Sequence, residues 1–457
     1  MLLFPPNWNP AMPHLALPTL TAFLRAHGVE VIQRDLNIEV FDEVLTRRYL
    51  EGALARLRRD YGPHGDRRPS RPIAAPRDLV AWALARGPRV AAQVERAKHT
   101  IRSAAFFDGP TGRRAIETIA DALQIASLPF FPAALELSTY RAALTADGTR
   151  NILRETRDPQ LNMLLEIYRR GVLADIEREQ PDVVGISIAC MAQMLPGLTI
   201  AALIKERGLR CHVTVGGPHI TMLRERLAQA PQLFELIDSA VVFDGEVPLL
   251  RLCEALAGDL SGVPNLIYRD GAAIRVTERK NPEKIGALPL PDFAGLPLDR
   301  YLAPRLVLPL LTARGCYYGK CAFCNVGYGE PESFSLMRSE LLAEQMYTLK
   351  RTYGAEEIFF SDEALTPRTL RELSQILKRD GVPLLWGGCA RFERPIASDL
   401  LRLMHEGGCR MILFGLESAS EAIMQRMLKG TQLDHMHRIL QESTAAGIWN
   451  HTFFFFG

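Results

Sequence analysis

Three cysteines lie close together in the stretch "RGCYYGKCAFC", where Cys316, Cys321 and Cys324 have the spacing C-x4-C-x2-C. Thiolates at these separations on one loop can converge on a single metal centre. A structural zinc site usually has four protein ligands, and a cubane iron–sulfur cluster normally takes four thiolates. Three thiolates would leave one iron of a cubane open to a non-protein ligand. The lack of a fourth cysteine would therefore leave a coordination position for such a ligand.

The other five cysteines are scattered through apolar contexts, and we interpret them as small buried hydrophobic residues: Cys190, Cys211, Cys253, Cys389 and Cys409. A zinc site would need a further ligand such as Cys389, Cys409 or His405, each of which lies on a separate predicted strand or helix. The cysteines do not form the disulfide framework of a secreted protein, so we expect a reducing, cytoplasmic location.

Polar residues end several predicted strands in the same part of the chain. Asp362 ends the apolar run "EEIFFSDE", Arg391 follows "PLLWGGCA", and Glu417 and Ser418 end "RMILFGLES". The carboxyl ends of parallel strands meet at one edge of a sheet or one mouth of a barrel, where sites are usually built. Taken singly, each charged residue could equally form an ion pair at a strand end. Together with the cysteines, they predict one site.

A second set of small and polar residues ends the predicted strands of the N-terminal half. Ser187 ends "VVGIS", Gly216 and Gly217 follow "VTV", and Gly245 and Glu246 follow "VVFD". Glycines at strand ends let a bulky ligand approach the backbone closely. A single glycine pair is a weak signal, whereas three such strand ends in order predict a ligand site at the edge of a sheet.

The elements that position these residues fall into two regions. Residues 1–285 alternate strand and helix patterns, which predicts a doubly wound parallel α/β sheet. A mainly helical insertion, residues of about 45–178, interrupts this sheet. It contains a basic stretch, which we interpret either as a solvated helical face or as an electropositive wall that faces an anionic ligand. A proline-rich stretch, 286–305, predicts a linker. Residues 306–457 show five strand–helix units, which predict a partial parallel barrel; because the chain stops on the strand "FFFFG", we expect it to be incomplete.

Composition gives no reason to expect a nucleic acid or a membrane as a partner. The net charge is +2, and 47% of residues are hydrophobic. The uncharged stretch Val183 to Ile204 is interrupted by glycine, proline and glutamine, so we interpret it as a strand, a loop and a helix start. The N-terminus has no basic segment followed by an apolar run, as a signal peptide would.

With these motifs in order, the region 306–457 resembles the radical S-adenosylmethionine (SAM) family. The resemblance rests on the cysteines, on Phe323 just before the last of them, and on "IFFSDEALTP", "LWGGCARFE", "GLESAS" and "FFFFG". It implies that Cys316, Cys321 and Cys324 hold a [4Fe–4S] cluster whose open iron binds SAM. It also implies SAM contacts from the following residues: Phe323, Asp362, Arg391, Glu417 and Ser418. The family's usual spacing is C-x3-C-x2-C, so the first gap here has one extra residue.

The N-terminal sheet ahead of such a barrel resembles the cobalamin-binding class of that family. The resemblance implies cobalamin contacts from the strand-end residues Ser187, Gly216, Gly217, Gly245 and Glu246. Cobalamin mutases place a histidine on cobalt with the motif D-x-H-x-x-G. The loop after the second strand reads "DLNIEV" here, with Asn37 in the histidine's place, so no histidine ligand is predicted in that loop. We expect His219 to cap the next helix or to contact the cobalamin tail.

The resemblance implies an enzyme that methylates an unactivated carbon, using a 5′-deoxyadenosyl radical and methylcobalamin. Its partners would be a small-molecule or peptide substrate and a one-electron reductant of flavodoxin or ferredoxin type. Three alternatives stay open: a rearrangement, cyclisation or oxidation without methyl transfer; a cobalamin-binding sensor with a degenerate barrel; and a zinc-stabilised structural protein.

Overall fold

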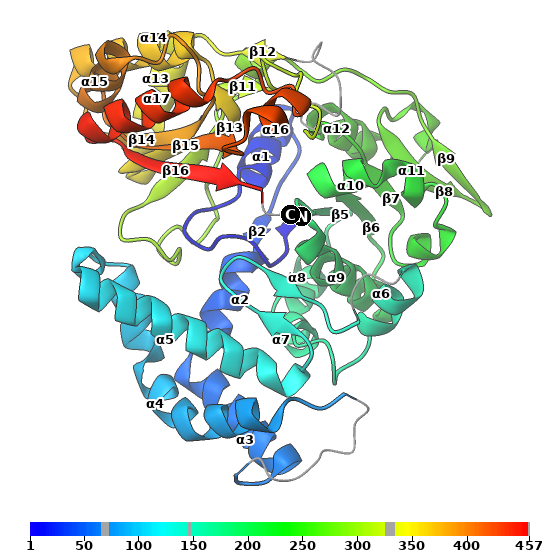
Figure 1. Cartoon of the computed structure of the whole chain (residues 1–457). Coiled ribbons are helices and arrows are strands. Elements are labelled where there is room, and N and C mark those ends of the chain that lie inside the picture. The colour runs from blue at the N-terminus through cyan, green and yellow to red at the C-terminus, as the bar shows by residue number, and fades with distance from the viewer. Residues whose placement is uncertain (65–72, 145–147, 257, 325–333, 456–457) are drawn as a thin grey trace. The chain divides into compact units, whose positions relative to one another are not determined.

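The computed structural model describes residues 1–457 except 65–72, 145–147, 257, 325–333 and 456–457. The chain divides into two compact units (Figure 1). Unit 1 comprises Met1–Lys280 and Asp292–Pro304, and unit 2 comprises Asn281–Pro291 and Arg305–Gly457. Each unit is built around its own sheet, so the two are described separately.

The sheet of unit 1 has the strand order β2-β1-β5-β6-β7-β8-β9. Neighbouring strands from β2 to β7 pair in parallel, and β8 and β9 add an antiparallel edge. The strands are β1 (Leu2–Phe4), β2 (Gln33–Asp35), β5 (Val183–Ser187), β6 (His212–Gly216), β7 (Ser239–Val241), β8 (Leu266–Asp270) and β9 (Ala273–Val276). The predicted doubly wound α/β fold is confirmed. The sequence had not revealed that the first residues form an inner strand.

The uncharged stretch Val183 to Ile204 folds as predicted into a strand, a loop and a helix. Strand β5 is buried at every position, and α9 (Met194–Glu206) is buried from Met194 to Ile204. Because both elements are covered on all sides, their apolar character is that of a protein core. Across the described residues, no helix combines the length and the apolar character needed to cross a membrane.

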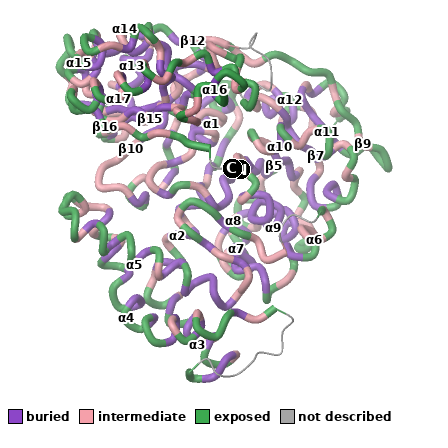
Figure 2. The backbone as a smooth tube through the Cα atoms, in the orientation of Figure 1, coloured by how far each residue is buried: buried purple, intermediate pink, exposed green. Residues whose placement is uncertain are grey.

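Helices dominate the part of unit 1 between β2 and β5, where the sequence predicted a helical insertion. They are α2 (Leu36–Val44), α3 (Arg47–Tyr61), α4 (Arg77–Ile101), α5 (Gly109–Ser127), α6 (Thr149–Glu155), α7 (Leu164–Arg170) and α8 (Val172–Glu179), with the short strands β3 (Ala134–Leu135) and β4 (Tyr140–Arg141). Figure 2 shows α3, α4 and α5 with buried and exposed faces. Their buried residues belong to the same hydrophobic cluster as Leu3 and Ile186 of the sheet. The insertion therefore shares its core with the sheet.

The remaining α-helices of unit 1 are α1 (Ala16–Ala26), which packs on β1, β2 and α12, and three helices that follow β6 and β7: α10 (Pro218–Met222), α11 (Arg224–Leu227) and α12 (Glu246–Ala255). The segment predicted as a linker, 286–305, is divided between the units, and 292–304 packs on unit 1. Phe293 is fully buried there, and the hydroxyl of Tyr301 donates to Asp35 at 2.7 Å. Buried aromatic side chains hold this stretch in place despite its prolines.

The sheet of unit 2 has five parallel strands in chain order: β10 (Val307–Leu310), β13 (Glu357–Leu365), β14 (Leu385–Ala390), β15 (Cys409–Glu417) and β16 (Trp449–Phe454). The connecting helices are α13 (Ser339–Tyr353), α14 (Pro367–Asp380), α15 (Ser398–Glu406), α16 (Glu421–Arg426) and α17 (Leu433–Ala445). Helices α13, α14, α15 and α17 gather over one face of this sheet (Figure 1). A small hairpin pairs β11 (Ala313–Arg314) with β12 (Ser335–Leu336). All five predicted strands are present, and helices follow the first four of them in the described part of the chain.

Candidate functional site

In unit 1, the predicted cobalamin residues end three adjacent strands. Ser187 is the last residue of β5, Gly216 is the last of β6, and Gly245 and Glu246 begin α12 after β7. The loops after β5 and β6 are joined by a hydrogen bond from the Ile188 amide to the Gly216 carbonyl, 2.7 Å. The structure therefore brings these strand ends together at the carboxyl edge of the sheet, where α/β folds bind ligands.

Gly217 occupies a position that only glycine fits without strain. Its φ is +103°, and a Cβ built there would lie 2.6 Å from the carbonyl oxygen of Ile188. The missing side chain thus lets the loops after β5 and β6 pack against each other. His219, two residues later, lies inside α10, and its amide donates to Ile188 at 3.3 Å. Burial lowers the pKa of His219, and its side chain does not cap α10.

Two buried polar side chains that the sequence analysis did not single out fix the same edge. Gln193 accepts a hydrogen bond from the Ala189 amide at 2.7 Å and donates one to the Pro5 carbonyl at 2.6 Å. Thr221 accepts a hydrogen bond from the Phe243 amide at 2.8 Å. Both are fully buried, so the contacts replace the water that their polar atoms lose. Uncharged residues inside apolar runs gave no sequence signal of this role.

The segment "DLNIEV", predicted as a loop, is instead the end of β2 and the start of α2, and it has a structural role in unit 1. Asp35 caps α2 by accepting from the amides of Asn37 and Ile38, and Asn37 exchanges hydrogen bonds with the backbone of Trp8. Burial raises the pKa of Asp35 to about 7, against the opposing effect of hydrogen bonds from Tyr301 and the α2 amides. These contacts tie the start of α2 to the loop after β1.

The loop after β1 contains a histidine that the sequence analysis overlooked. His14 stacks on Phe4 with ring centroids 4.4 Å apart, and its Nδ1 accepts from the Ala16 amide at 3.3 Å. Burial lowers the pKa of His14 to about 4, so the ring is neutral at pH 7. This loop therefore presents an aromatic cluster of Phe4, Trp8 and His14 at the carboxyl end of β1.

In unit 2, the three cysteines follow the β11 strand on one loop. Cys316 and Cys321 are partly buried and Cys324 is exposed. Gly319 has a φ of +61°, so the extra residue of the first gap is accommodated in a turn with left-handed backbone. Within the described ranges, no three His, Cys, Asp or Glu side chains form a group that could hold a metal ion, which includes the cysteine trio. The donor set and its single loop fit a three-thiolate cluster site, but the thiols are not gathered around a common centre.

Asp362 fixes the chain immediately before the cysteine loop. Its buried carboxylate accepts hydrogen bonds from the amide and hydroxyl of Thr312 and from the amide of Ala313, at 2.6–3.0 Å. Burial raises the pKa of Asp362 to about 6, and the hydrogen bonds from Thr312 and Ala313 oppose the rise. These contacts make Asp362 a residue that positions the loop; the SAM contact expected of it stays a prediction.

Arg391 links the third strand to the cysteine loop. Its Nη1 lies 3.6 Å from the sulfur of Cys321, and its guanidinium stacks on Tyr318 at 3.6 Å from the ring centroid. Its Nε donates to Glu393 at 2.9 Å and its Nη2 to the Lys429 carbonyl at 2.5 Å. A buried guanidinium beside a sulfur can stabilise negative charge on a thiolate ligand.

Glu417 forms a buried ion pair at the end of β15, the alternative that the sequence analysis left open for it without identifying the partner. Its carboxylate lies 2.6 Å from the ammonium of Lys429, and both residues are at most 9% exposed. The Lys429 ammonium also lies 5.7 Å from the ring centroid of Phe323, which is 40% exposed. Ser418 follows Glu417, and its hydroxyl accepts from the Ser420 amide at 3.1 Å. Lys429 thus contacts Phe323, Arg391 and Glu417, and Arg391 in turn contacts Cys321.

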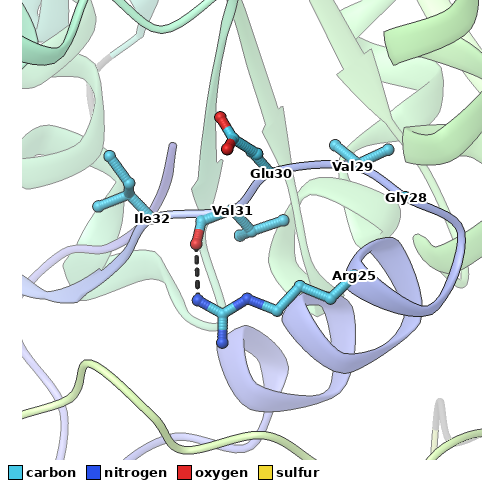
Figure 3. Close-up of a pocket in the computed structure, with 6 residues that line it drawn as sticks. All are labelled: Arg25, Gly28, Val29, Glu30, Val31 and Ile32. Atoms are coloured by element: carbon cyan, nitrogen blue, oxygen red, sulfur yellow. Dashed lines mark hydrogen bonds between the residues drawn. The ribbon is translucent and has the colours of Figure 1, made fainter.

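A pocket of about 530 Å³ lies elsewhere, in unit 1, between α1 and β2. Figure 3 shows that it is lined by Arg25 and the turn Gly28–Ile32, with the Arg25 guanidinium hydrogen-bonded to the Val31 carbonyl at 2.7 Å. It leads into the amino end of β2, opposite the edge that carries the predicted cobalamin residues. None of the predicted site residues lines it.

Comparison with known families agrees with the geometry of unit 1. Residues 132–252 match the B12 binding domain family, and this range includes β5, β6, β7 and their strand-end residues. The chain is 30% identical over 290 residues to an uncharacterized methyltransferase of Pyrococcus horikoshii, a match that covers 61% of each chain. It is 22% identical over 334 residues to a hopanoid C-3 methylase of Methylococcus capsulatus, covering 69% of this chain and 60% of the other.

A further relative is the bacteriochlorophyllide d C-12(1)-methyltransferase of Chlorobaculum tepidum, which is 25% identical over 225 residues, covering 48% of this chain and 44% of the other. The chain therefore spans about half to three fifths of the length of the curated relatives it matches. Among solved structures, the cobalamin-dependent SAM radical enzyme OxsB with aqua-cobalamin bound superposes with a TM-score of 0.53 and 21% identity, over 64% of this chain and 43% of that one. The cobalamin-binding part of the resemblance drawn from the sequence is thus supported by a B12 binding domain match over residues 132–252, and about two thirds of the chain shares the fold of OxsB.

Proposed function

We propose that this chain is a cobalamin-dependent radical SAM enzyme that methylates an unactivated carbon of a small-molecule or peptide substrate. The observation that carries the proposal is the combination of two sites in one chain. Unit 1 contains a B12 binding domain, and unit 2 places three cysteines at the carboxyl end of the first strand of a parallel sheet. The names of the curated relatives, which are methyltransferases, favour methyl transfer over the other radical outcomes.

The residues of unit 2 would hold the first two cofactors. Cys316, Cys321 and Cys324 would bind a [4Fe–4S] cluster through their thiolates. Arg391 would stabilise the charge on the Cys321 sulfur, and Phe323, Glu417 and Ser418 would contact SAM. When bound, the cluster supplies an electron for cleavage of SAM and cobalamin supplies the methyl group. The electron must come from an external reductant such as a flavodoxin or a ferredoxin.

The residues of unit 1 would receive cobalamin at the edge of the sheet. Ser187, Gly216, Gly217, Gly245 and Glu246 surround the strand ends, and the absence of a side chain at Gly217 keeps the loops after β5 and β6 in close packing. The buried Gln193 and Thr221 would hold these loops in the same conformation before and after binding. A preformed edge of this kind spares the ligand the entropy of ordering the loops.

Anaerobic reconstitution with iron, sulfide, hydroxocobalamin and SAM under dithionite tests the proposal. We expect iron and sulfide to bind, cobalamin to co-purify and 5′-deoxyadenosine to form. Cys324→Ala should abolish the iron, sulfide and deoxyadenosine, whereas the matched control Cys253→Ala, a half-buried cysteine of α12, should retain them. Zinc without sulfide would identify a structural zinc protein instead, and bound cobalamin without deoxyadenosine would identify a binding module.

Methyl transfer itself needs a second measurement. With SAM that carries a deuterated methyl group, candidate substrates that contain unactivated carbons should gain the label. If deoxyadenosine forms together with an altered but unlabelled product, the reaction is a rearrangement, cyclisation or oxidation and not a methylation.

A further inference from the structure

The connection between α16 and α17 lies directly against the cysteine loop. We call its residues 427–430, "MLKG", the strap. Three successive strap carbonyls accept hydrogen bonds: Met427 from the Ala322 amide at 2.9 Å, Leu428 from the Tyr318 hydroxyl at 2.6 Å, and Lys429 from Arg391 at 2.5 Å. A backbone whose three consecutive carbonyls all accept hydrogen bonds is held in a defined conformation, because a change in its dihedral angles would break these bonds.

The strap reaches both gaps of the cysteine motif. Tyr318 lies between Cys316 and Cys321, and Ala322 lies between Cys321 and Cys324. The third contact reaches Arg391, which lies 3.6 Å from the Cys321 sulfur and stacks on the Tyr318 ring. Each gap is therefore tied to the strap once. The wider first gap is tied through the long side chain of Tyr318.

The strap is itself fixed by its backbone and by the buried ion pair. Leu428 has a φ of +53° while its side chain is 59% exposed, so side-chain packing does not explain this unfavourable conformation. Gly430 has a φ of +71°, and a Cβ there would lie 2.5 Å from the Tyr318 hydroxyl oxygen. The Lys429 ammonium is anchored to Glu417 at the end of β15. The ion pair with Glu417 of β15 thus fixes the conformation of the strap, and the strap carbonyls in turn bond the cysteine loop.

We propose that residues 427–430 position the cysteine loop before any metal is bound. The strap is a positioning element: it touches the residues between the cysteines and acts on the cluster through them. The inference rests on the proposed function for the identity of the cluster, but the ordering of the loop by the strap is a property of the chain alone. Experiments can therefore refute the identity of the cluster and the ordering of the loop independently of each other.

Hydrogen exchange of the full chain prepared without iron tests the ordering. Gly430→Ala should make amides in residues 316–324 exchange about tenfold faster, because the new methyl group would displace the Tyr318 hydroxyl from the strap and strain the backbone at a φ of +71°. The matched control is Gly381→Ala, which has a similar φ of +61° but no atom within 4 Å of the new Cβ. It should leave this loop unchanged. Equal exchange of residues 316–324 in the two variants would overturn the proposal.

Tyr318→Phe provides a milder change that removes only the hydroxyl bonded to Leu428. It should raise exchange in residues 316–324 while α14 and β14 keep their protection, a local effect that general destabilisation would not produce. After reconstitution, we expect less iron and sulfide per chain and an altered electron paramagnetic resonance spectrum of the reduced cluster. A spectrum and loading identical to those of the unaltered protein, with unchanged exchange, would contradict a positioning role. If the unaltered protein bound no cluster, the proposed function would fail while the exchange data still decided the role of the strap.

Discussion

The edge of the unit 1 sheet and the cysteine loop of unit 2 are organised by different physical means. The first is built from small residues and uncharged hydrogen bonds, with Gly217 allowing close packing and Gln193 and Thr221 tying the loops. The second is held by buried charges. Asp362 bonds the chain just before the cysteines, and Lys429 of the strap pairs with Glu417 of β15. The ligands proposed above would suit this difference, because a large, rigid cofactor would need an open, preformed edge, whereas a loop that held a metal cluster would need strong bonds to fix thiolates that repel each other.

This contrast has consequences for mutation. Where packing of the backbone shapes a site, adding a single methyl group should do more harm than removing a polar group. Where buried charges shape it, removing one partner should do the greater harm, because the other charge is left without compensation. The following changes test both sides of the comparison.

Lys429→Met should have the largest effect. It leaves the Glu417 carboxylate buried without its partner, so we expect the free energy of unfolding to fall by about 3–5 kcal/mol in chemical denaturation. The double variant Lys429→Met/Glu417→Gln should recover part of the loss. The control Arg368→Ala breaks an exposed pair with Glu372 of similar length, 2.7 Å, and should cost less than about 0.5 kcal/mol. A similar small loss in both single variants would show that the buried pair does not stabilise unit 2.

Gly217→Ala should have the next largest effect, on unit 1. The new methyl group would meet the Ile188 backbone at 2.6 Å and would force a φ of +103° on a residue with a Cβ, so we expect a loss of about 2–4 kcal/mol. Cobalamin binding, followed by absorption of the bound cofactor, should weaken as well. Gly271→Ala in the β8–β9 turn has a φ of +57° and open space around it, and it should leave binding unchanged. If the Gly217 variant bound cobalamin as tightly as the unaltered protein, the loop after β6 would not be part of the cobalamin site.

The smallest effect that we expect is a pH dependence from Asp35. Burial raises the pKa of this carboxyl from 3.8 to about 7, so the folded state binds a proton that the unfolded state has lost between these values. The contribution of this carboxyl group to the free energy of unfolding is therefore fully present below pH 3.8 and is lost as the pH rises to about 7. Comparison with Asp35→Asn in denaturation between pH 5 and 8 should show the unaltered protein losing on the order of 2 kcal/mol relative to the variant. A constant difference across this range would show that Asp35 is ionised throughout.

Much of the architecture could be predicted from local patterns. The five strands of unit 2 are apolar runs separated by amphipathic helices, and β5 and β6 are short buried runs ending in small residues. Strand β1 was missed because three apolar residues before a proline pair give too short a pattern. The packing of residues 292–304 on unit 1 was missed because their prolines indicated a linker, whereas the buried Phe293 and Tyr301 decide their position.

The cysteine spacing, the glycine at position 217 and the alternation of strands and helices were determined by the sequence itself, because each depends on residues near one another in the chain. The tertiary structure alone decided which partners those residues have. It paired Lys429 with Glu417, placed Arg391 beside Cys321 and laid residues 427–430 against a loop more than a hundred positions earlier, where Leu428 and Tyr318 are 110 residues apart. Such contacts leave no periodic trace in the sequence, since they form only when strands in chain order bring their carboxyl ends to one edge of the sheet.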